Sequence, residues 1–544
     1  MSKITVDRKL LATQRKIEKL ISNNDFSKAE ELLHREYSKH KSHKDFGYIN
    51  LLTLGRLNMQ LDRKDRAEQF LFQAIDVDDT NPEAPKFLTQ VYLETKQFHA
   101  AIRIIDLLLQ IDKECFDYRY WKILALCSIP ERSNEILDDW RNIERDFPEL
   151  KQDTQIHNAI VFGLLGAGRI TEAESHCLKY KLDQTFDSST GQLLPALYLA
   201  KNEPQKAVSV LSKMIEIQPK NYSWQWNRGL ILLSMGKLKE GWRDYESRWR
   251  WPDFPSPKRN LNLSLWDGED LRGKSIIISA EQGIGDQILF SVSINKLLTL
   301  GPKTVRIEVQ DKLIELFGLW YPECEIASFQ NNPEIDSVLE NSFDFHLPMA
   351  TLTARFMTDR QAVKQLPRRL IKISEAEKNE VLGEFRENFK YIIGLSWRSS
   401  AVDSIRLTNY ANAKFAKYIV DALPSDIGFV MLQYAVTEDE KNLFENYQNV
   451  LFPKEDFFND ILTHGRYCGA CDLVVSAGTM VVPLAGLFST PTIAWGSPYS
   501  WSLLGFQQIP WSPNNNAIIG NANYDRRTLA DTIVAKLRIA MRLT

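Results

Sequence analysis

Short segments that mix charged and apolar residues recur along the first half of the chain, each around a small central residue. The segments are SKAEELL (27–33), DRAEQFL (65–71), HAAIRII (99–105), TEAESHC (171–177), QKAVSVL (205–211) and KEGWRDY (239–245). Their central residues are Ala29, Ala67, Ala101, Ala173, Ala207 and Gly241. Three of the intervals between these residues are 34 residues, and those of 38 and 72 residues fit one and two repeats with a four-residue insertion.

A 34-residue period with a small residue at a helix contact is typical of tetratricopeptide repeats, in which each repeat is a helix pair. Gly55 and Gly229 lie twelve residues before their central residues, at the small position expected in the first helix. The pattern therefore predicts an α-solenoid over residues 1–252. The concave face of such a superhelix binds a peptide or protein, or serves as a dimerisation surface in a homo-oligomer.

The pattern changes after residue 252. Residues 253–273 are rich in Pro, Asn, Asp and Gly, which indicates a linker. Beyond it, short apolar runs alternate with helical stretches, as in a parallel α/β sheet. The runs are SIIISAE (275–281), VRIEV (305–309), CEIASF (324–329), FDFHLPM (343–349), YIIGLSW (391–397), GFVMLQY (428–434), NVLFP (449–453), DLVVSAG (472–478) and TPTIAWG (490–496).

The charged helical stretch at 373–388 divides these runs into two series. We therefore predict two Rossmann-like domains, at 274–389 and 390–544. A crevice between two such domains is the usual place for a nucleotide-containing ligand.

Composition excludes several classes of protein. A formal net charge of −3 and a pI of about 6.3 over 544 residues give no general reason to bind nucleic acid or an anionic membrane. The N-terminus is charged and lacks the apolar core of a signal peptide. No apolar run approaches the ~20 residues of a membrane span. We therefore expect a cytoplasmic protein whose six cysteines are reduced.

The turn AEQGIGDQILF (280–290) is the first candidate site. Gly283 and Gly285 let a ligand approach the backbone, but the third glycine of a dinucleotide fingerprint is missing. Asp286 at the helix start has two interpretations that the local pattern does not separate: a cap for free N–H groups, or a catalytic carboxylate.

The turn in DLVVSAGTMVVPLAGL (472–487) is the second candidate. At a helix N-terminus, the free N–H groups of Gly478, Thr479 and Met480 would bind an anion such as a diphosphate, unless this is an ordinary strand–helix turn. Polar residues at the ends of neighbouring strands could add contacts to a phosphate. The full set expected on the donor side is Trp397, Arg398, Ser399, Ser400, Arg406, Gln433, Ser476, Gly478, Thr479 and Met480.

Other residues carry weaker signals. His346 lies at a predicted strand end facing the crevice, and with Gly283 and Gly285 completes the expected acceptor side. Cys468 and Cys471 form a C-x-x-C without a second pair at zinc spacing, so we interpret them as buried small residues. No metal site is expected.

The combination of GKLKEGWRDYESRW, LWDGEDLRGKSIIISAEQGIGDQILF, FDFHLPMATL, GLSWRSS and CDLVVSAGTMVVPLAGLFSTPTIAWG with the repeats resembles a known family. It is similar to bacterial proteins that fuse tetratricopeptide repeats to a heptosyltransferase-like GT-B glycosyltransferase domain, and most of all to flagellin-modifying glycosyltransferases. The resemblance implies an α-solenoid followed by a GT-B pair, with the nucleotide-sugar donor bound mainly to the second domain.

The resemblance also implies roles for residues. Asp286 would be the general base that takes a proton from a Ser or Thr hydroxyl of a protein acceptor, with help from Glu281 or Gln282. The transfer would need no metal and no cofactor beyond the nucleotide sugar. The late turn lacks an Asp and a His that many heptosyltransferase-like proteins carry. A CMP-activated nonulosonic acid, such as pseudaminic acid, therefore fits better than ADP-heptose.

Two other classes of protein compete with this interpretation. A non-enzymatic scaffold or chaperone with a degenerate glycosyltransferase domain would bind partners without transferring sugar. A nucleotide-dependent oxidoreductase or epimerase would bind a nicotinamide cofactor, although the imperfect glycine fingerprint argues against it.

Overall fold

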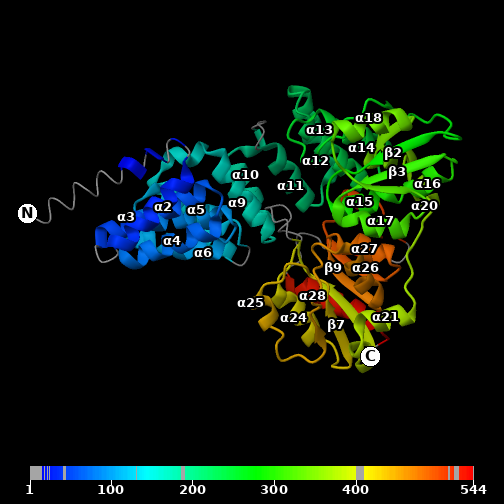
Figure 1. Cartoon of the computed structure of the whole chain (residues 1–544). Coiled ribbons are helices and arrows are strands. Elements are labelled where there is room, and N and C mark those ends of the chain that lie inside the picture. The colour runs from blue at the N-terminus through cyan, green and yellow to red at the C-terminus, as the bar shows by residue number, and fades with distance from the viewer. Residues whose placement is uncertain are drawn as a thin grey trace, which may run out of the picture. The chain divides into compact units, whose positions relative to one another are not determined.

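The chain begins with consecutive helix pairs in the computed structural model (Figure 1). The structure describes residues 15–17, 19–20, 23, 25–40, 44–129, 132–184, 190–399, 410–512, 515–519 and 526–542. The helices of this region are α2 (Phe26–His40), α3 (Lys44–Gln60), α4 (Lys64–Val77), α5 (Glu83–Glu94), α6 (Phe98–Ile111), α7 (Phe116–Leu126), α8 (Ser133–Asp146), α9 (Thr154–Gly166), α10 (Ile170–Lys179), α11 (Thr190–Ala200), α12 (Pro204–Ile217), α13 (Tyr222–Ser234) and α14 (Leu238–Tyr245).

The predicted repeat is confirmed by where its small residues lie. The five central alanines are fully buried, in α2, α4, α6, α10 and α12, and Gly241 lies in α14. From α4 onward, each of these is the second helix of a described pair. The 72-residue interval is filled by α7 and α8, which supply the missing pair. The chain thus has tetratricopeptide-like helix pairs, followed by an α/β region.

Gly229 shows why the small residues are needed. A Cβ at this position would lie 2.8 Å from the Tyr245 backbone nitrogen and 2.9 Å from the Gly241 carbonyl oxygen. The helices α13 and α14 therefore touch through their backbones. The backbone of a packed helix cannot shift as a flexible side chain can.

Gly229→Ala is expected to destabilise the protein by about 1–3 kcal/mol, because the added methyl group overpacks this contact. Gly318→Ala in α17 (Ile314–Trp320) is the matched control, since no atom lies within 4 Å of the added Cβ. The control should be neutral or slightly stabilising, as alanine is the better helix former. Thermal unfolding midpoints would compare the two variants, and equal midpoints would contradict the argument.

The chain divides into two compact units, which we describe separately. The first is Met1–Ala167 with Thr171–Leu182, and the second is Gly168–Ile170 with Asp183–Thr544. The last helix pairs, α11 to α14, thus belong to the same compact unit as the sheets. Among the described helices, none has both the length and the hydropathy that a membrane span requires.

A buried histidine pair lies between α9 and α10 of the first unit. His157 Nδ1 lies 2.9 Å from His176 Nε2, and the His157 ring stacks on Tyr180 with ring centroids 4.0 Å apart. Burial lowers the pKa of both histidines, and with the neighbouring His157 and Lys179 it brings the pKa of His176 to about 3. The folded protein therefore holds this pair neutral where the unfolded chain would bind protons.

The first unit is expected to lose stability as the pH falls through the ordinary histidine pKa of about 6.5. A basic group with a lowered folded pKa binds fewer protons in the native than in the unfolded state, so stability rises with pH between the two pKa values. Protonation of His176 in the unfolded chain should by itself lower the free energy of unfolding by about 2 kcal/mol at about pH 5. Unfolding midpoints across this range would show a shallower dependence for His176→Gln and an unchanged one for the exposed His99→Gln. Parallel curves for all three proteins would contradict this account.

The second unit contains two parallel sheets. The first has the strand order β1-β5-β2-β3-β4 and the second β11-β10-β9-β6-β7-β8. The strands are β1 (Ser264–Leu265), β2 (Ser275–Ser279), β3 (Thr304–Val309), β4 (Glu325–Ser328), β5 (Phe345–Pro348), β6 (Tyr391–Ser396), β7 (Ile427–Met431), β8 (Val450–Leu451), β9 (Leu473–Ala477), β10 (Thr492–Gly496) and β11 (Asn515–Ile519). All nine predicted strands are confirmed.

The helices of this region follow the strands. They are α15 (Ile284–Ser291), α16 (Ile294–Leu298), α17, α18 (Pro333–Ser342), α19 (Met349–Phe356), α20 (Arg360–Gln365), α21 (Glu375–Leu382), α22 (Glu384–Asn388), α24 (Ala413–Asp421), α25 (Glu438–Asn442), α26 (Ile461–Ala470), α27 (Val481–Leu487) and α28 (Arg526–Ala540). The predicted helix at 373–388 is split by Gly383, whose φ of 53° ends α21.

The segment predicted as a linker is packed against the first sheet. Its residues Ser264–Leu265 form the edge strand β1, paired with β5. The buried Arg259 donates to Glu308 at 2.7 Å and lies 2.6 Å from Asp336. We call the first sheet with the helices that follow its strands the first α/β half, and the second sheet with its helices the second half. Residues 253–273 are part of the first α/β half, because these pairings connect them to its sheet and helices.

Each sheet has a point where the strand order reverses. After the edge strand β1, the chain enters the middle of the first sheet at β2, and it enters the second sheet at β6. From each of these strands it runs outward in one direction and then returns to the other side of that strand. The reversals lie between β2 and β5 and between β6 and β9. Ligands of open α/β sheets bind outside the carboxyl ends of the strands at such a reversal. The turns after β2, β6 and β9 are therefore the places to look for a site.

Candidate functional site

A cavity of about 650 Å³ lies where these turns meet. Its wall combines residues of the first α/β half, such as Gly283 and Asp286, with residues of the second, such as Thr479 and Trp495. Helices α15 and α27, which follow the turns, pack against each other (Figure 1). The volume suits a small-molecule ligand the size of a nucleotide sugar.

Asp286 lies on the wall of this cavity, in the first turn of α15. Its carboxylate accepts a hydrogen bond from the Gly283 N–H at 3.3 Å. The carboxylate therefore caps the helix, as one interpretation of the sequence predicts, and it also lines the cavity.

The glycines of this turn bring the two α/β halves together. A Cβ at Gly285 would lie 3.3 Å from the Cα of Met480, so the two turns meet closely and an added methyl group would press on the backbone of the other turn. Gly283, Gly285 and Met480 all line the cavity. The glycine at 285 is thus explained by close approach to the other half, since nothing in its backbone angles requires it.

The second turn lines the cavity, but two of its three predicted N–H groups are not free. The Gly478 N–H donates to the Trp495 carbonyl at 2.8 Å, and the Thr479 N–H to the Ala477 carbonyl at 2.6 Å. The Val481 N–H is 3.3 Å from the Thr479 hydroxyl oxygen. The expectation of unpaired N–H groups is therefore wrong for Gly478 and Thr479, because their N–H groups already donate to carbonyls of β10 and β9.

The strand-end residues of β6 and β7 act mainly behind the cavity wall. The Gln433 side-chain oxygen accepts from the backbone N–H groups of Trp397 and Arg398, each at 2.9 Å. The Arg398 guanidinium donates to Glu440 at 2.6 Å. None of these three predicted donor contacts lines the cavity, whereas Ser399 does.

The remaining predicted donor contacts and His346 fall into two groups. Ser476 is fully buried and its hydroxyl donates to the Ala477 carbonyl at 2.8 Å. His346 is buried beside β2, where its Nε2 lies 2.8 Å from the Ser279 hydroxyl, and burial with nearby Arg259 and Lys258 lowers its pKa to about 4. Neither lines the cavity. Ser400 and Arg406 lie outside the described residues.

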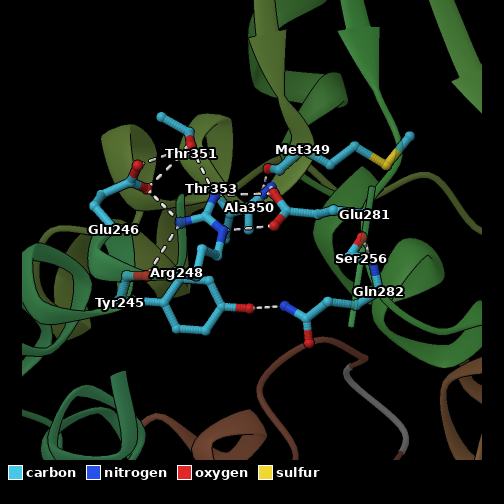
Figure 2. Close-up of polar contacts among 10 residues, drawn as sticks. All are labelled: Tyr245, Glu246, Arg248, Ser256, Glu281, Gln282, Met349, Ala350, Thr351 and Thr353. Carbon is cyan, nitrogen blue, oxygen red and sulfur yellow. Dashed lines mark hydrogen bonds and ion pairs between the residues drawn. The ribbon is translucent and has the colours of Figure 1, made fainter. Parts of the chain in front are cut away.

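Glu281 is engaged in a buried ion pair instead of facing the cavity (Figure 2). Its carboxylate accepts from Arg248 at 2.6 and 3.0 Å and from the Ala350 N–H at 2.9 Å. Arg248 is 0% exposed, follows the last helix pair, and also donates to Glu246 at 2.9 Å and Thr351 at 2.8 Å. Burial raises the pKa of Glu281, while the Arg248 charge opposes that shift.

Gln282 is held next to this ion pair with a φ of 63°, which is unusual for a residue other than glycine. Its backbone N–H donates to the Ser256 hydroxyl at 2.9 Å, and its side chain donates to the Tyr245 hydroxyl. Its carbonyl accepts from Gln287 at 3.1 Å and Gln310 at 3.0 Å. The structure thus places Glu281 and Gln282 as anchors of the turn that carries Asp286.

Several residues of the cavity wall were missed by the sequence analysis, among them Lys312, Tyr434, Phe458 and Trp501. Trp501 stacks on Phe290 of the first half with ring centroids 5.1 Å apart. Lys312 follows β3 by three residues, so the rule that ligands bind at the carboxyl ends of strands could have found it. Among the described residues, no group of three or more His, Cys, Asp and Glu is arranged to hold a metal ion.

Comparison with known proteins gives one curated relative of note. No family model matches the chain. Protein FlbA of Caulobacter vibrioides (strain ATCC 19089 / CIP 103742 / CB 15) is 28% identical over 311 residues, which cover 53% of this chain and 50% of that protein. The chain thus matches about half the length of this relative.

Solved structures similar to the chain are tetratricopeptide-repeat proteins. One, from Parabacteroides merdae ATCC 43184, is 16% identical with a TM-score of 0.37, over 44% of this chain and 91% of its own. Another, YrrB, described as having an unusual peptide-binding site, is 19% identical with a TM-score of 0.27, over 34% of this chain and 92% of its own.

Proposed function

We propose that this protein is a protein O-glycosyltransferase, which transfers a sugar from a nucleotide-sugar donor to a Ser or Thr of a protein acceptor. The acceptor we favour is flagellin, and the donor a CMP-activated nonulosonic acid such as pseudaminic acid. The observation that carries the proposal is the cavity at the strand-order reversals of two parallel sheets, with the Asp286 carboxylate on its wall.

The chemistry follows from this arrangement. Asp286 takes the proton of the acceptor hydroxyl, and the oxygen attacks the anomeric carbon of the donor sugar. The bond between that carbon and the phosphate oxygen breaks, and the nucleotide leaves with the negative charge. Ser399 and the turn at Gly478–Met480 would contact the donor from the second half, since all of them line the cavity.

Trp397, Arg398, Gln433 and Ser476 support the donor side from behind in this proposal. Their hydrogen bonds fix the ends of β6 and β9, from which Ser399 and Thr479 reach the cavity. Positioning residues of this kind keep contact residues within the small tolerance that group transfer requires.

The helix pairs of the first unit would recruit the acceptor protein. Stacked helix pairs expose a large surface for their length, and a flexible protein segment can bind along the concave face. Recruitment raises the local concentration of the acceptor Ser or Thr near the transferase unit.

The test is a transfer assay with the full-length protein, a purified flagellin and separate CMP-, ADP- and UDP-sugars. Intact-mass analysis should show the flagellin gaining the mass of the sugar with one donor class, and CMP-nonulosonic acids are expected to be that class. Transfer only from ADP-heptose would correct the donor. Tight flagellin binding without transfer from any donor would favour the non-enzymatic scaffold.

A further inference from the structure

Lys312 lies on the cavity wall in the short helix η5 (Asp311–Leu313), which follows β3. Its Nζ donates to the Phe458 carbonyl at 2.9 Å and lies 3.6 Å from the centroid of the Phe458 ring. Lys312 and Asp286 are the two charged residues among the described residues that line this cavity. The wall therefore offers a ligand one positive group, which comes from the first α/β half.

Three other groups that could meet an anion are already engaged within the protein. The N–H groups of Gly478 and Thr479 donate to carbonyls within the second half. Arg398 is paired with Glu440 behind the wall. An anionic ligand in the described part of the cavity thus has Lys312 as its one cationic partner.

The ammonium of Lys312 retains binding capacity. It has three N–H donors, and the Phe458 carbonyl takes one of them. Asp456, whose pKa is lowered first by its hydrogen bond to Asn459 and in part by Lys312, accepts from Asn459 at 2.6 Å and from the Phe458 N–H at 3.0 Å. The nearby carboxylate is therefore held by its own loop, and the half-buried ammonium keeps donors for a ligand.

We propose that Lys312 is a specificity-determining residue that binds an anionic group of the donor, either the phosphate of the nucleotide or a carboxylate on the sugar. This inference rests on the proposed function and adds the donor chemistry that the first α/β half recognises. A donor bound in this way is held from both halves, with Lys312 on one side and the turns after β6 and β9 on the other.

The two sources of negative charge predict different behaviour. If Lys312 holds the phosphate, it contacts every nucleotide sugar and also the charge that develops on the leaving group. If it holds a sugar carboxylate, it selects acidic sugars over neutral ones and leaves the binding of the free nucleotide unchanged.

The experiment is calorimetric titration of the full-length protein with CMP, UDP, ADP, free N-acetylneuraminic acid and CMP-N-acetylneuraminic acid. Lys312→Met should weaken binding of the nucleotide sugar by about 10- to 100-fold, the usual cost of losing a charged hydrogen bond. Lys312→Arg should recover most of it. Lys296→Met in α16, an exposed lysine outside the cavity wall, is the control and should bind as wild type does.

The outcomes separate the two proposals. Weaker binding of free nucleotide by Lys312→Met assigns the ammonium to the phosphate, and a loss confined to the acidic nucleotide sugar or free acid assigns it to the carboxylate. Equal binding by wild type and Lys312→Met would overturn the role of Lys312 and leave the transferase proposal intact. A wild type that binds none of these compounds would overturn both.

Discussion

Glu281→Ala is expected to lower the free energy of unfolding of the second unit by about 3–5 kcal/mol, because it leaves the Arg248 charge buried without its partner. Both side chains of this pair are 0% exposed, and two hydrogen bonds of 2.6 and 3.0 Å join them. Chemical denaturation followed by tryptophan fluorescence would measure the loss, since Trp242 and Trp249 lie in the same region.

Asp270→Ala is the matched control for this loss. Asp270 also receives a paired contact from an arginine, Arg272, with oxygen–nitrogen distances of 2.6 to 3.0 Å, but the two side chains are 57% and 81% exposed. An exposed pair of this kind contributes little to stability, because water and salt screen the two charges. A similar loss in the two variants would mean that burial does not govern the strength of the Glu281 contact.

A double variant tests the cause of the loss directly. Arg248→Met with Glu281→Leu removes both charges and keeps apolar volume, and replacement of a buried pair in this way is often neutral. It should therefore be more stable than Glu281→Ala alone. A double variant less stable than the single one would show that Glu246 and Thr351, which Arg248 also contacts, outweigh the ion pair.

The helix pairs and the predicted strands could be predicted from sequence because their signals are local. A small residue every 34 positions and an apolar run after a turn each report on a contact of the segment that contains them. Strand β1 was not predicted, because its two residues lie in a Pro- and Asn-rich segment without hydrophobic periodicity and both are exposed. Such a strand is defined by its partner β5, which lies some eighty residues later.

The residues of the candidate site also differ in whether local sequence or distant partners determine their positions. Asp286 and its glycines were predicted from a strand–turn–helix pattern, and the structure places them on the cavity wall. Glu281 and Arg398 have equally polar surroundings in the sequence. In the structure they form ion pairs with Arg248 and Glu440, which are 33 and 42 residues away in the chain, and they do not line the cavity. Sequence pattern shows which side chains could reach a cavity, and distant partners decide which of them do.

Asp286→Asn is expected to lower the rate of transfer by about 10²- to 10⁴-fold, the contribution of a positioned general base. The substitution keeps a side-chain oxygen that can accept from the Gly283 N–H, so thermal stability should stay near that of wild type. Asp286→Ala removes base and cap together, and should add a loss of about 1 kcal/mol in stability to the same loss of rate. Transfer rates against a flagellin acceptor and unfolding midpoints would be measured on all three proteins.

The pair of variants distinguishes the two roles of this carboxylate. If Asp286 is only a cap, Asn retains full turnover and Ala loses stability alone. If it is the base, Asn has the stability of wild type without its turnover. Full turnover by Asp286→Asn would mean that the base lies elsewhere on the cavity wall. Because Asp286 is the one carboxylate among the described lining residues, that result would point to the nearby tyrosines, Tyr410 and Tyr434.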